Sequence, residues 1–269
     1  FETVADQIAS ELGARPETLY AEFDREPFAS ASIGQVHRAV TDEGRQVVVK
    51  VQYPGIDESV GSDLGQLKMA LRASGFLNRD KRRAFDLMFD EIEARLQEEL
   101  DYTVEAGNVR LFRQMYAGDE KVAVPEVIGE RSAKRVLTLG YEPGDSLETV
   151  RHEYTWEQKD AIGEKLFRMF GGQLFRHKTI HADPNPANFA FRPDGTVVLY
   201  DYGCIKRLEE EQHRALVAVM RASLRGDWEA LDRALLELGA RVADKPPLDD
   251  EIYETWHRIF ISPILEQDP

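Results

Sequence analysis

Two short motifs in the second half of the chain carry oxygen ligands at a spacing that suits phosphoryl transfer. Residues 181–188 (HADPNPAN) have the form H-x-D-x-x-x-x-N, and residues 201–203 (DYG) begin thirteen positions after Asn188. In phosphoryl transfer the first aspartate orients or deprotonates the acceptor, while the asparagine and the second aspartate hold Mg²⁺. Each motif alone is an ordinary turn sequence. Together they predict Asp183 as a catalytic residue and Asn188 and Asp201 as metal ligands.

A second pair of motifs lies upstream. Residues 29–36 (ASASIGQV) follow the kinase phosphate-loop pattern G-x-G-x-x-G-x-V with two glycines replaced by alanine, which restricts positive φ and stiffens the loop. Lys50 follows fourteen positions after Val36, in a strand-like VVVKV segment, and such a lysine contacts the α and β phosphates. Lys50 is therefore predicted to act in catalysis and in nucleotide binding. The predicted loop residues are Ala29, Ser30, Ala31, Ser32, Gly34 and Val36.

The lysine of such a strand normally pairs with a glutamate on a helix. The acidic stretch from 98 to 105 offers Glu98, Glu99 and Glu105. On a straight helix Asp101 and Glu105 share a face and Glu99 points elsewhere. Spacing alone does not choose the partner.

These motifs together resemble the UbiB/AarF family of atypical protein-kinase-like ATPases, over about residues 8–240. The resemblance implies an alanine-rich nucleotide loop and a hinge beside adenine that includes Leu139 and Tyr141. It also implies that Glu99 and Asp101 form the family's Glu-x-Asp element and that Glu105 is the helix glutamate. The sequence departs from the family at Asn185, where histidine is frequent, and it lacks the family's Lys-x-Gly-Gln segment.

The resemblance implies ATP and Mg²⁺ as cofactors and a kinase-like ATPase or phosphotransferase linked to isoprenoid-quinone or lipid metabolism. Isoprenoid lipids or quinone-biosynthesis proteins would be the partners. One alternative is a small-molecule phosphotransferase of the aminoglycoside or choline type, against which the alanine-rich loop and Glu-x-Asp argue. Another is a nucleotide-sensing scaffold without turnover. Ala182 replaces the arginine that receives an activation-loop phosphate, and helical periodicity resumes near Glu209, which leaves no room for a long activation loop.

These motifs need a scaffold of both helices and strands. Helical periodicity is expected over 1–24, 57–117, 156–178 and from 209 onward, and strands over 26–53, 122–128, 135–139 and on both sides of 193–195. The order predicts an α+β, bilobal protein-kinase-like fold. We expect a small β-rich N-lobe with a prominent helix (1–139), a flexible hinge (140–145) and a larger helical C-lobe (146–269).

Composition limits the class of protein. The 269 residues include 34 Lys and Arg against 49 Asp and Glu, a net charge of −15, so phosphate backbones would repel the chain and nucleic-acid binding is not expected. No apolar stretch is long enough to span a membrane, so any membrane contact would be peripheral. One cysteine, Cys204, excludes an internal disulfide and fits a reducing compartment, the cytoplasm or an organelle matrix. Cys204 is expected to be a small buried residue.

Overall fold

The computed structural model describes residues 1–31, 33–73 and 79–262, apart from the side chains of residues 58–60, 73, 79–84 and 260. The chain forms two compact units. The larger unit comprises Phe1–Lys165 and Asp183–Cys204, and the smaller unit comprises Leu166–Ala182 and the chain from Ile205 onward. The expected lobes, divided at residues 140–145, separate the chain elsewhere and remain a prediction.

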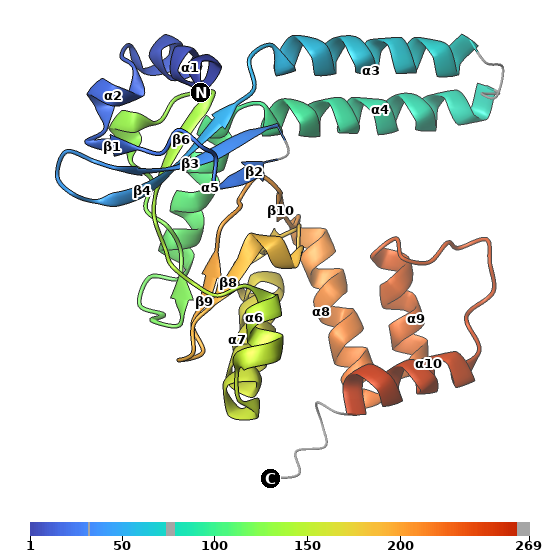
Figure 1. Cartoon of the computed structure of the whole chain (residues 1–269). Helices are drawn as coiled ribbons and strands as arrows, with labels where there is room; N and C mark the ends of the chain where they lie inside the picture. The colour runs from blue at the N-terminus through green and yellow to red at the C-terminus, as the bar shows by residue number, and fades with distance from the viewer. Residues whose placement is uncertain (32, 74–78, 263–269) are drawn as a thin grey trace. The chain divides into compact units, whose positions relative to one another are not determined.

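A five-stranded antiparallel sheet forms the first part of the larger unit (Figure 1). Four strands lie in the order β1-β3-β4-β6, and β2 pairs with the beginning of β3. Their bounds are β1 (Glu22–Phe23), β2 (Ala29–Ala31), β3 (Gly34–Val40), β4 (Gln46–Gln52) and β6 (Val136–Gly140). Gly44 turns the chain between β3 and β4 with φ +79°, so the hairpin predicted within residues 26–53 is confirmed.

The sheet has two different faces because side chains alternate along each strand. Val47, Val49 and Val51 of β4 are buried in a core that also contains Val4 and Ile8 of helix α1 (Glu2–Leu12). The residues between them, such as Val48 and Lys50, therefore point to the opposite face. In the strand register Val36 lies beside Lys50 and Arg38 beside Val48, so they share that face.

Two long helices and a shorter one follow the sheet hairpin: α3 (Ile56–Ala73), α4 (Arg79–Glu99) and α5 (Tyr102–Met115). The helical periodicity expected over 57–117 is borne out in the described residues, and residues 74–78 lie outside them; the acidic stretch, however, is not one straight helix. Asp101 has extended backbone angles (φ −126°, ψ 95°) and its side chain accepts a hydrogen bond from the backbone N–H of Thr103. It is the N-cap of α5, so the face that Asp101 and Glu105 were expected to share does not exist.

A three-stranded sheet completes the larger unit, with β5 (Val122–Ala123) parallel to β9 (Val197–Leu199) and β8 (Phe189–Phe191) antiparallel to it. The β8–β9 hairpin turns at Gly195, where φ is +84°. Asn188 immediately precedes β8, and Asp201 follows two residues after β9. The hairpin thus brings both predicted metal ligands to one end of the same element.

The remaining elements are mostly helical. The larger unit contains α2 (Pro16–Leu19), the short 3₁₀ turns Gly129–Arg131 and Pro186–Asn188, and α6 (Leu147–Glu153); α7 (Trp156–Gly172) begins there and continues into the smaller unit. The smaller unit also contains the π-helix Gln173–His177, β7 (Thr179–His181) paired with β10 (Ile205–Arg207), α8 (Glu210–Arg225), α9 (Trp228–Glu237), α10 (Asp250–Trp256) and the π-helix His257–Ile261. The predicted α+β class is confirmed.

Two details bear on function. Helix α8 begins at Glu210, only a short segment after Gly203, so the predicted absence of a long activation loop is confirmed. None of the helices in the described part of the chain is both long enough and apolar enough to cross a lipid bilayer.

Candidate active site

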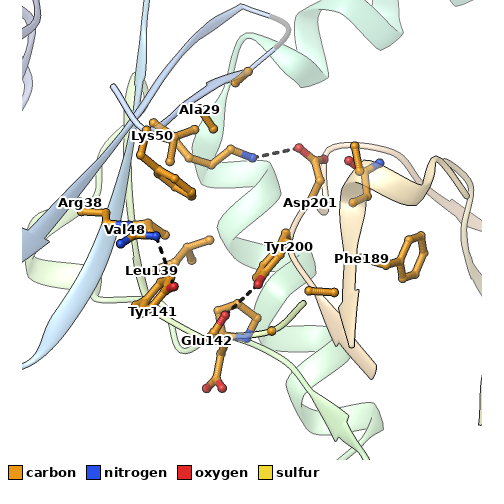
Figure 2. Close-up of a pocket in the computed structure, with 18 of the residues that line it drawn as sticks. Ala29, Arg38, Val48, Lys50, Leu139, Tyr141, Glu142, Phe189, Tyr200 and Asp201 are labelled. Carbon is orange, nitrogen blue, oxygen red and sulfur yellow. Dashed lines mark hydrogen bonds and ion pairs between the residues drawn. The ribbon is translucent and has the colours of Figure 1, made fainter. Parts of the chain in front are cut away.

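A cavity of about 400 Å³ lies within the larger unit (Figure 2). One wall is the face of the five-stranded sheet that carries Val48 and Lys50. The other wall is formed by the segment after β6 and the ends of the β8–β9 hairpin. The predicted site residues that line it are Ala29, Ser30, Ala31, Val36, Lys50, Leu139, Tyr141, Asn188 and Asp201. Residues from five separate segments therefore meet around one space of the size that binds small molecules.

Lys50 lies between two carboxylates. Its Nζ is 2.6 Å from Oε1 of Glu105 and 3.0 Å from Oδ2 of Asp201 (Figure 2 draws the second pair). The side chains of Lys50 and Glu105 are only 8% and 6% exposed, and the ring of Tyr102 lies beside the ammonium group. Burial by itself would lower the pKa of Lys50, but the charges of Glu105 and Asp201 outweigh it and raise this pKa. The lysine is therefore held charged and in a fixed position.

Glu105 is thus the glutamate that pairs with Lys50 in this structure. Oε1 of Glu105 also accepts a hydrogen bond of 3.2 Å from the backbone N–H of Tyr202, so helix α5 is joined to both the β4 strand and the DYG motif. The side chain of Asn108, one turn further along α5, donates to the carbonyl of Tyr202 at 2.9 Å. These contacts fix Asp201 relative to Lys50.

Asp183 and Asn188 are held together within one loop. The Asn188 amide nitrogen donates to Oδ2 of Asp183 at 2.7 Å and to the Asp183 carbonyl at 3.2 Å. This orientation uses the amide nitrogen and leaves its oxygen for a cation, the hard ligand that Mg²⁺ prefers. Asp201 uses Oδ1 to accept from the backbone N–H of Gly203 at 2.8 Å. The pair of Asn188 and Asp201 therefore fits a magnesium site in its donor chemistry.

Among the described residues, no group of three or more His, Cys, Asp and Glu side chains is arranged to hold a metal ion. A divalent cation bound by Asn188 and Asp201 would therefore complete its shell with oxygens that the protein does not supply. Mg²⁺ commonly binds in this way, through one or two protein ligands together with substrate phosphates and water.

The Glu-x-Asp element is divided by the break between α4 and α5. Glu99 ends α4, and burial together with the nearby charges of Asp201 and Asp183 raises its pKa. Glu99 therefore lies close enough to Asp183 and Asp201 for their charges to act on it, although it does not line the cavity. Asp101 does not line the cavity, and its Oδ1 accepts hydrogen bonds from the backbone and hydroxyl of Thr103. Neither residue of the Glu-x-Asp element lines the cavity: Glu99 lies within the electrostatic reach of Asp201, and Asp101 caps helix α5.

Gly34 does not line the cavity, but it permits the close packing of β3 on β4 in the sheet that forms one wall of the cavity. A Cβ atom at this position would lie 2.2 Å from the carbonyl oxygen of Val51 on the neighbouring strand. Only glycine allows β3 to approach β4 this closely. Ser32, the other predicted loop residue, lies outside the described residues.

Arg38 and Tyr200 are among the lining residues that the sequence motifs did not indicate. Arg38 lies over the rings of Phe28 and Tyr141, with the guanidinium carbon 4.8 and 5.1 Å from the ring centres. The period-two alternation that places Val36 on the Lys50 side also places Arg38 there, so the pattern could have indicated it. Tyr200 directly precedes Asp201, and nothing in the sequence marks its contacts.

Cys204 was expected to be buried, and this prediction is wrong. The residue is exposed and belongs to neither a helix nor a strand, since it lies between the DYG motif and β10. The side chains of Glu105 and Asp201 hold the backbone just before it, at Tyr202 and Gly203. Because Cys204 is not part of a strand, the alternation of a sheet does not place its side chain in a core.

Comparisons with known proteins identify relatives of this chain. The COQ8 atypical kinase of Saccharomyces cerevisiae, a mitochondrial protein, is 34% identical over 205 residues, which cover 76% of this chain and 40% of that protein. A probable protein kinase UbiB of Xylella fastidiosa is 31% identical, covering 86% of this chain and 44% of its own length. The chain thus spans less than half the length of these relatives.

The fold is also found in a solved structure. Rv3197 of Mycobacterium tuberculosis, determined in complex with erythromycin, superposes with a TM-score of 0.80 at 29% identity, covering 98% of this chain and 66% of that chain. The kinase-like fold class is therefore confirmed, as is the resemblance to UbiB proteins. The family described as the ABC1 atypical kinase-like domain matches residues 1–235. The chain belongs to this family of atypical kinases.

Proposed function

We propose that this chain binds ATP with Mg²⁺ in the cavity and cleaves or transfers its terminal phosphoryl group. The observation that carries the proposal is the position of Lys50, buried between Glu105 and Asp201 at one end of a cavity whose other walls are largely apolar. The apolar walls suit a flat apolar head, and the Lys50 ammonium group can donate to an anionic tail. Because Lys50 lies between two carboxylates, such a tail would bind together with a divalent cation.

Each residue has a separate task in this proposal. Val36, Val48 and Leu139 provide apolar surface for a nucleoside base, and the Lys50 ammonium group donates to the phosphate oxygens. Asn188 and Asp201 would hold Mg²⁺, which supplies charge stabilisation for the phosphates when it is bound. Asp183, already oriented by Asn188, accepts a proton from, or orients, the attacking hydroxyl or water.

The proposed acceptor and pathway rest on the relatives and the family resemblance, and not on the cavity. COQ8 and UbiB are the names of relatives that support a role in isoprenoid-quinone metabolism, and we extend that role to this chain as a proposal. A quinone-biosynthesis protein or an isoprenoid lipid would then be the partner. Location in a reducing compartment, with peripheral membrane contact, remains a proposal in the same way.

Phosphate release from ATP tests the proposal. We expect the wild type to release phosphate in Mg²⁺ and the variants Asp183→Asn and Asp201→Asn to lose at least 100-fold. Asp194→Asn is the matched control, because Asp194 pairs with Lys121 on the surface and does not line the cavity. All three changes remove one carboxylate charge, so only the position differs.

The assay is run with and without anionic lipid vesicles and with nucleotide binding measured in parallel. Equal phosphate release by the wild type and both site variants under every condition would refute the proposal that this site cleaves or transfers the terminal phosphoryl group of ATP. Tight Mg–ATP binding without release would support the scaffold instead. A loss in Asp194→Asn as large as in the site variants would show that the effect of charge is not local.

A further inference from the structure

The segment that follows β6 was expected to be a flexible hinge, yet it is tied to the β8–β9 hairpin by side chains and backbone. The Arg192 guanidinium donates to the Glu142 carboxylate at 2.7 Å and to the Pro143 carbonyl at 2.9 Å. Asp145 and Phe191 exchange two backbone hydrogen bonds of 2.7 and 2.9 Å. The segment therefore moves with the hairpin that carries Asn188 and Asp201.

Tyr200 is the residue at which these connections meet the cavity. Its hydroxyl donates to the carbonyl of Glu142 at 2.9 Å (Figure 2). Its backbone N–H donates to the carbonyl of Asn188 at 2.9 Å, and the next residue is Asp201. The side chain also forms part of the cavity wall. One residue thus contacts the wall near the proposed base site and both proposed metal ligands.

Gly144 makes the close approach between the segment and the hairpin possible. A Cβ atom there would lie 2.8 Å from the Cβ of Ala190 and 3.2 Å from the backbone nitrogen of Phe191. The segment therefore packs directly on the hairpin, with no space for it to shift independently.

We infer that Tyr200 is a positioning residue that couples the base end of the cavity to the metal ligands, an inference that rests on the proposed nucleotide site. A nucleotide that seats its base against the segment fixes Glu142, and the Tyr200 hydroxyl holds the backbone that carries Asn188 and Asp201. Base and metal then reinforce each other's binding through a single rigid element. Loss of this hydroxyl should weaken the reinforcement as well as the binding of the base.

Tyr154 offers a matched control. Its hydroxyl donates to the Asp145 carboxylate at 2.8 Å and lies 3.3 Å from the carbonyl of Phe191, so Tyr154→Phe also removes phenolic hydrogen bonding to the same segment and to the hairpin. Tyr154 does not line the cavity and is not next to a metal ligand. A purely structural role of the segment predicts the same consequences for Tyr154→Phe and Tyr200→Phe.

The experiment measures the dissociation constant of ADP by calorimetry in EDTA and in excess Mg²⁺, for the wild type, Tyr200→Phe and Tyr154→Phe. We expect Tyr200→Phe to weaken ADP binding in EDTA by about 2–10-fold, the value of one net hydrogen bond. We further expect the strengthening of ADP binding by Mg²⁺ to fall by at least about 3-fold. Tyr154→Phe should leave both quantities within about 2-fold of the wild type. The two variants should lower Tm by similar amounts.

Wild-type values for Tyr200→Phe, or equal changes in the two variants, would overturn the inference alone. A change in ADP binding without a change in the Mg²⁺ effect would also overturn it, because the hydroxyl would then serve the base only. If the wild type binds no nucleotide with or without Mg²⁺, the proposed function itself fails. The failure of the function and the failure of the inference are thus distinguishable.

Discussion

Replacing Glu105 by glutamine tests whether the lysine pair is a coupled unit. The change keeps the shape of the side chain but removes the charge that lies 2.6 Å from the Lys50 ammonium group. The glutamine oxygen can still accept from Lys50 or from Tyr202, while its amide nitrogen becomes a buried donor that needs a new partner. Lys50 keeps Asp201 at 3.0 Å, whose side chain is 40% exposed.

The expected cost follows from burial. Breaking a buried ion pair by removing one partner costs about 3–5 kcal/mol, because the remaining charge stays buried without compensation. The remaining contact to Asp201 reduces this, so we expect Glu105→Gln to lower the free energy of unfolding by about 3 kcal/mol. At about 2–4 °C per kcal/mol for a domain of this size, Tm should fall by about 6–12 °C.

The reverse change, Lys50→Met, leaves the Glu105 carboxylate buried, with the backbone N–H of Tyr202 still donating to it, so its cost should also be about 3 kcal/mol. In the double variant both charges are gone, and a neutral amide accepts from Tyr202. Apolar replacement of a buried pair is often nearly neutral. The double variant should therefore be more stable than the sum of the single costs predicts, by at least about 2 kcal/mol.

Urea unfolding followed by circular dichroism measures the three free energies, with phosphate release recorded for each variant. All three should lose phosphate release, so stability and not activity separates them. Additive single costs, with a coupling below about 0.5 kcal/mol, would refute the reasoning. That result would mean that Lys50 and Glu105 are stabilised separately by their surroundings.

Three further predictions concern single positions. Gly34→Ala should lower the free energy of unfolding by about 1–3 kcal/mol and weaken nucleotide binding, because the new Cβ would lie 2.2 Å from the carbonyl oxygen of Val51. Gly107→Ala, which places its Cβ in open space on a helix, should raise Tm, and thermal unfolding compares the two variants. The raised pKa of Glu99 means that its ionised form opposes folding. Glu99→Gln should therefore stabilise the protein at pH 8, by at most about 0.5 kcal/mol because solvent screens this exposed side chain. A pH series of urea titrations should show this gain disappearing as the pH falls towards 4. Asp232→Asn should lower the stability of the smaller unit, because the Asp232 carboxylate accepts two hydrogen bonds from Arg241. Nucleotide binding should be unchanged, because neither residue lines the cavity. Hydrogen exchange would show where the stability is lost.

Much of the site could be predicted because its signals are local. The alternation of valines in β4 indicates which face carries Lys50, and the spacing of Asp183, Asn188 and Asp201 follows the requirements of a single loop and hairpin. Each of these depends on residues within about twenty positions of one another. The family resemblance also implied Glu105 as the helix glutamate, which the motif spacing by itself could not select.

The parts that could not be predicted depend on contacts across long stretches of chain. The role of Asp101 depends on the helix break that it caps, and a pattern of helical periodicity runs through such a break without showing it. The exposure of Cys204 depends on where the segment after the DYG motif lies. The connection of Tyr200 to Glu142 joins residues 58 positions apart, and no local propensity describes it.

The sequence by itself therefore determined the candidate chemistry of this protein: the strand that presents Lys50, the loop that holds Asp183 and Asn188, and an acidic composition. Only the tertiary structure decided the geometry: Glu105 as the partner of the lysine, Glu99 beside the carboxylates, and Tyr200 between the two ends of the cavity. The physical reason is that residue type and spacing set what a side chain can do. Which side chains meet is decided by packing of the sheet, helix α5 and the β8–β9 hairpin, which lie far apart along the chain.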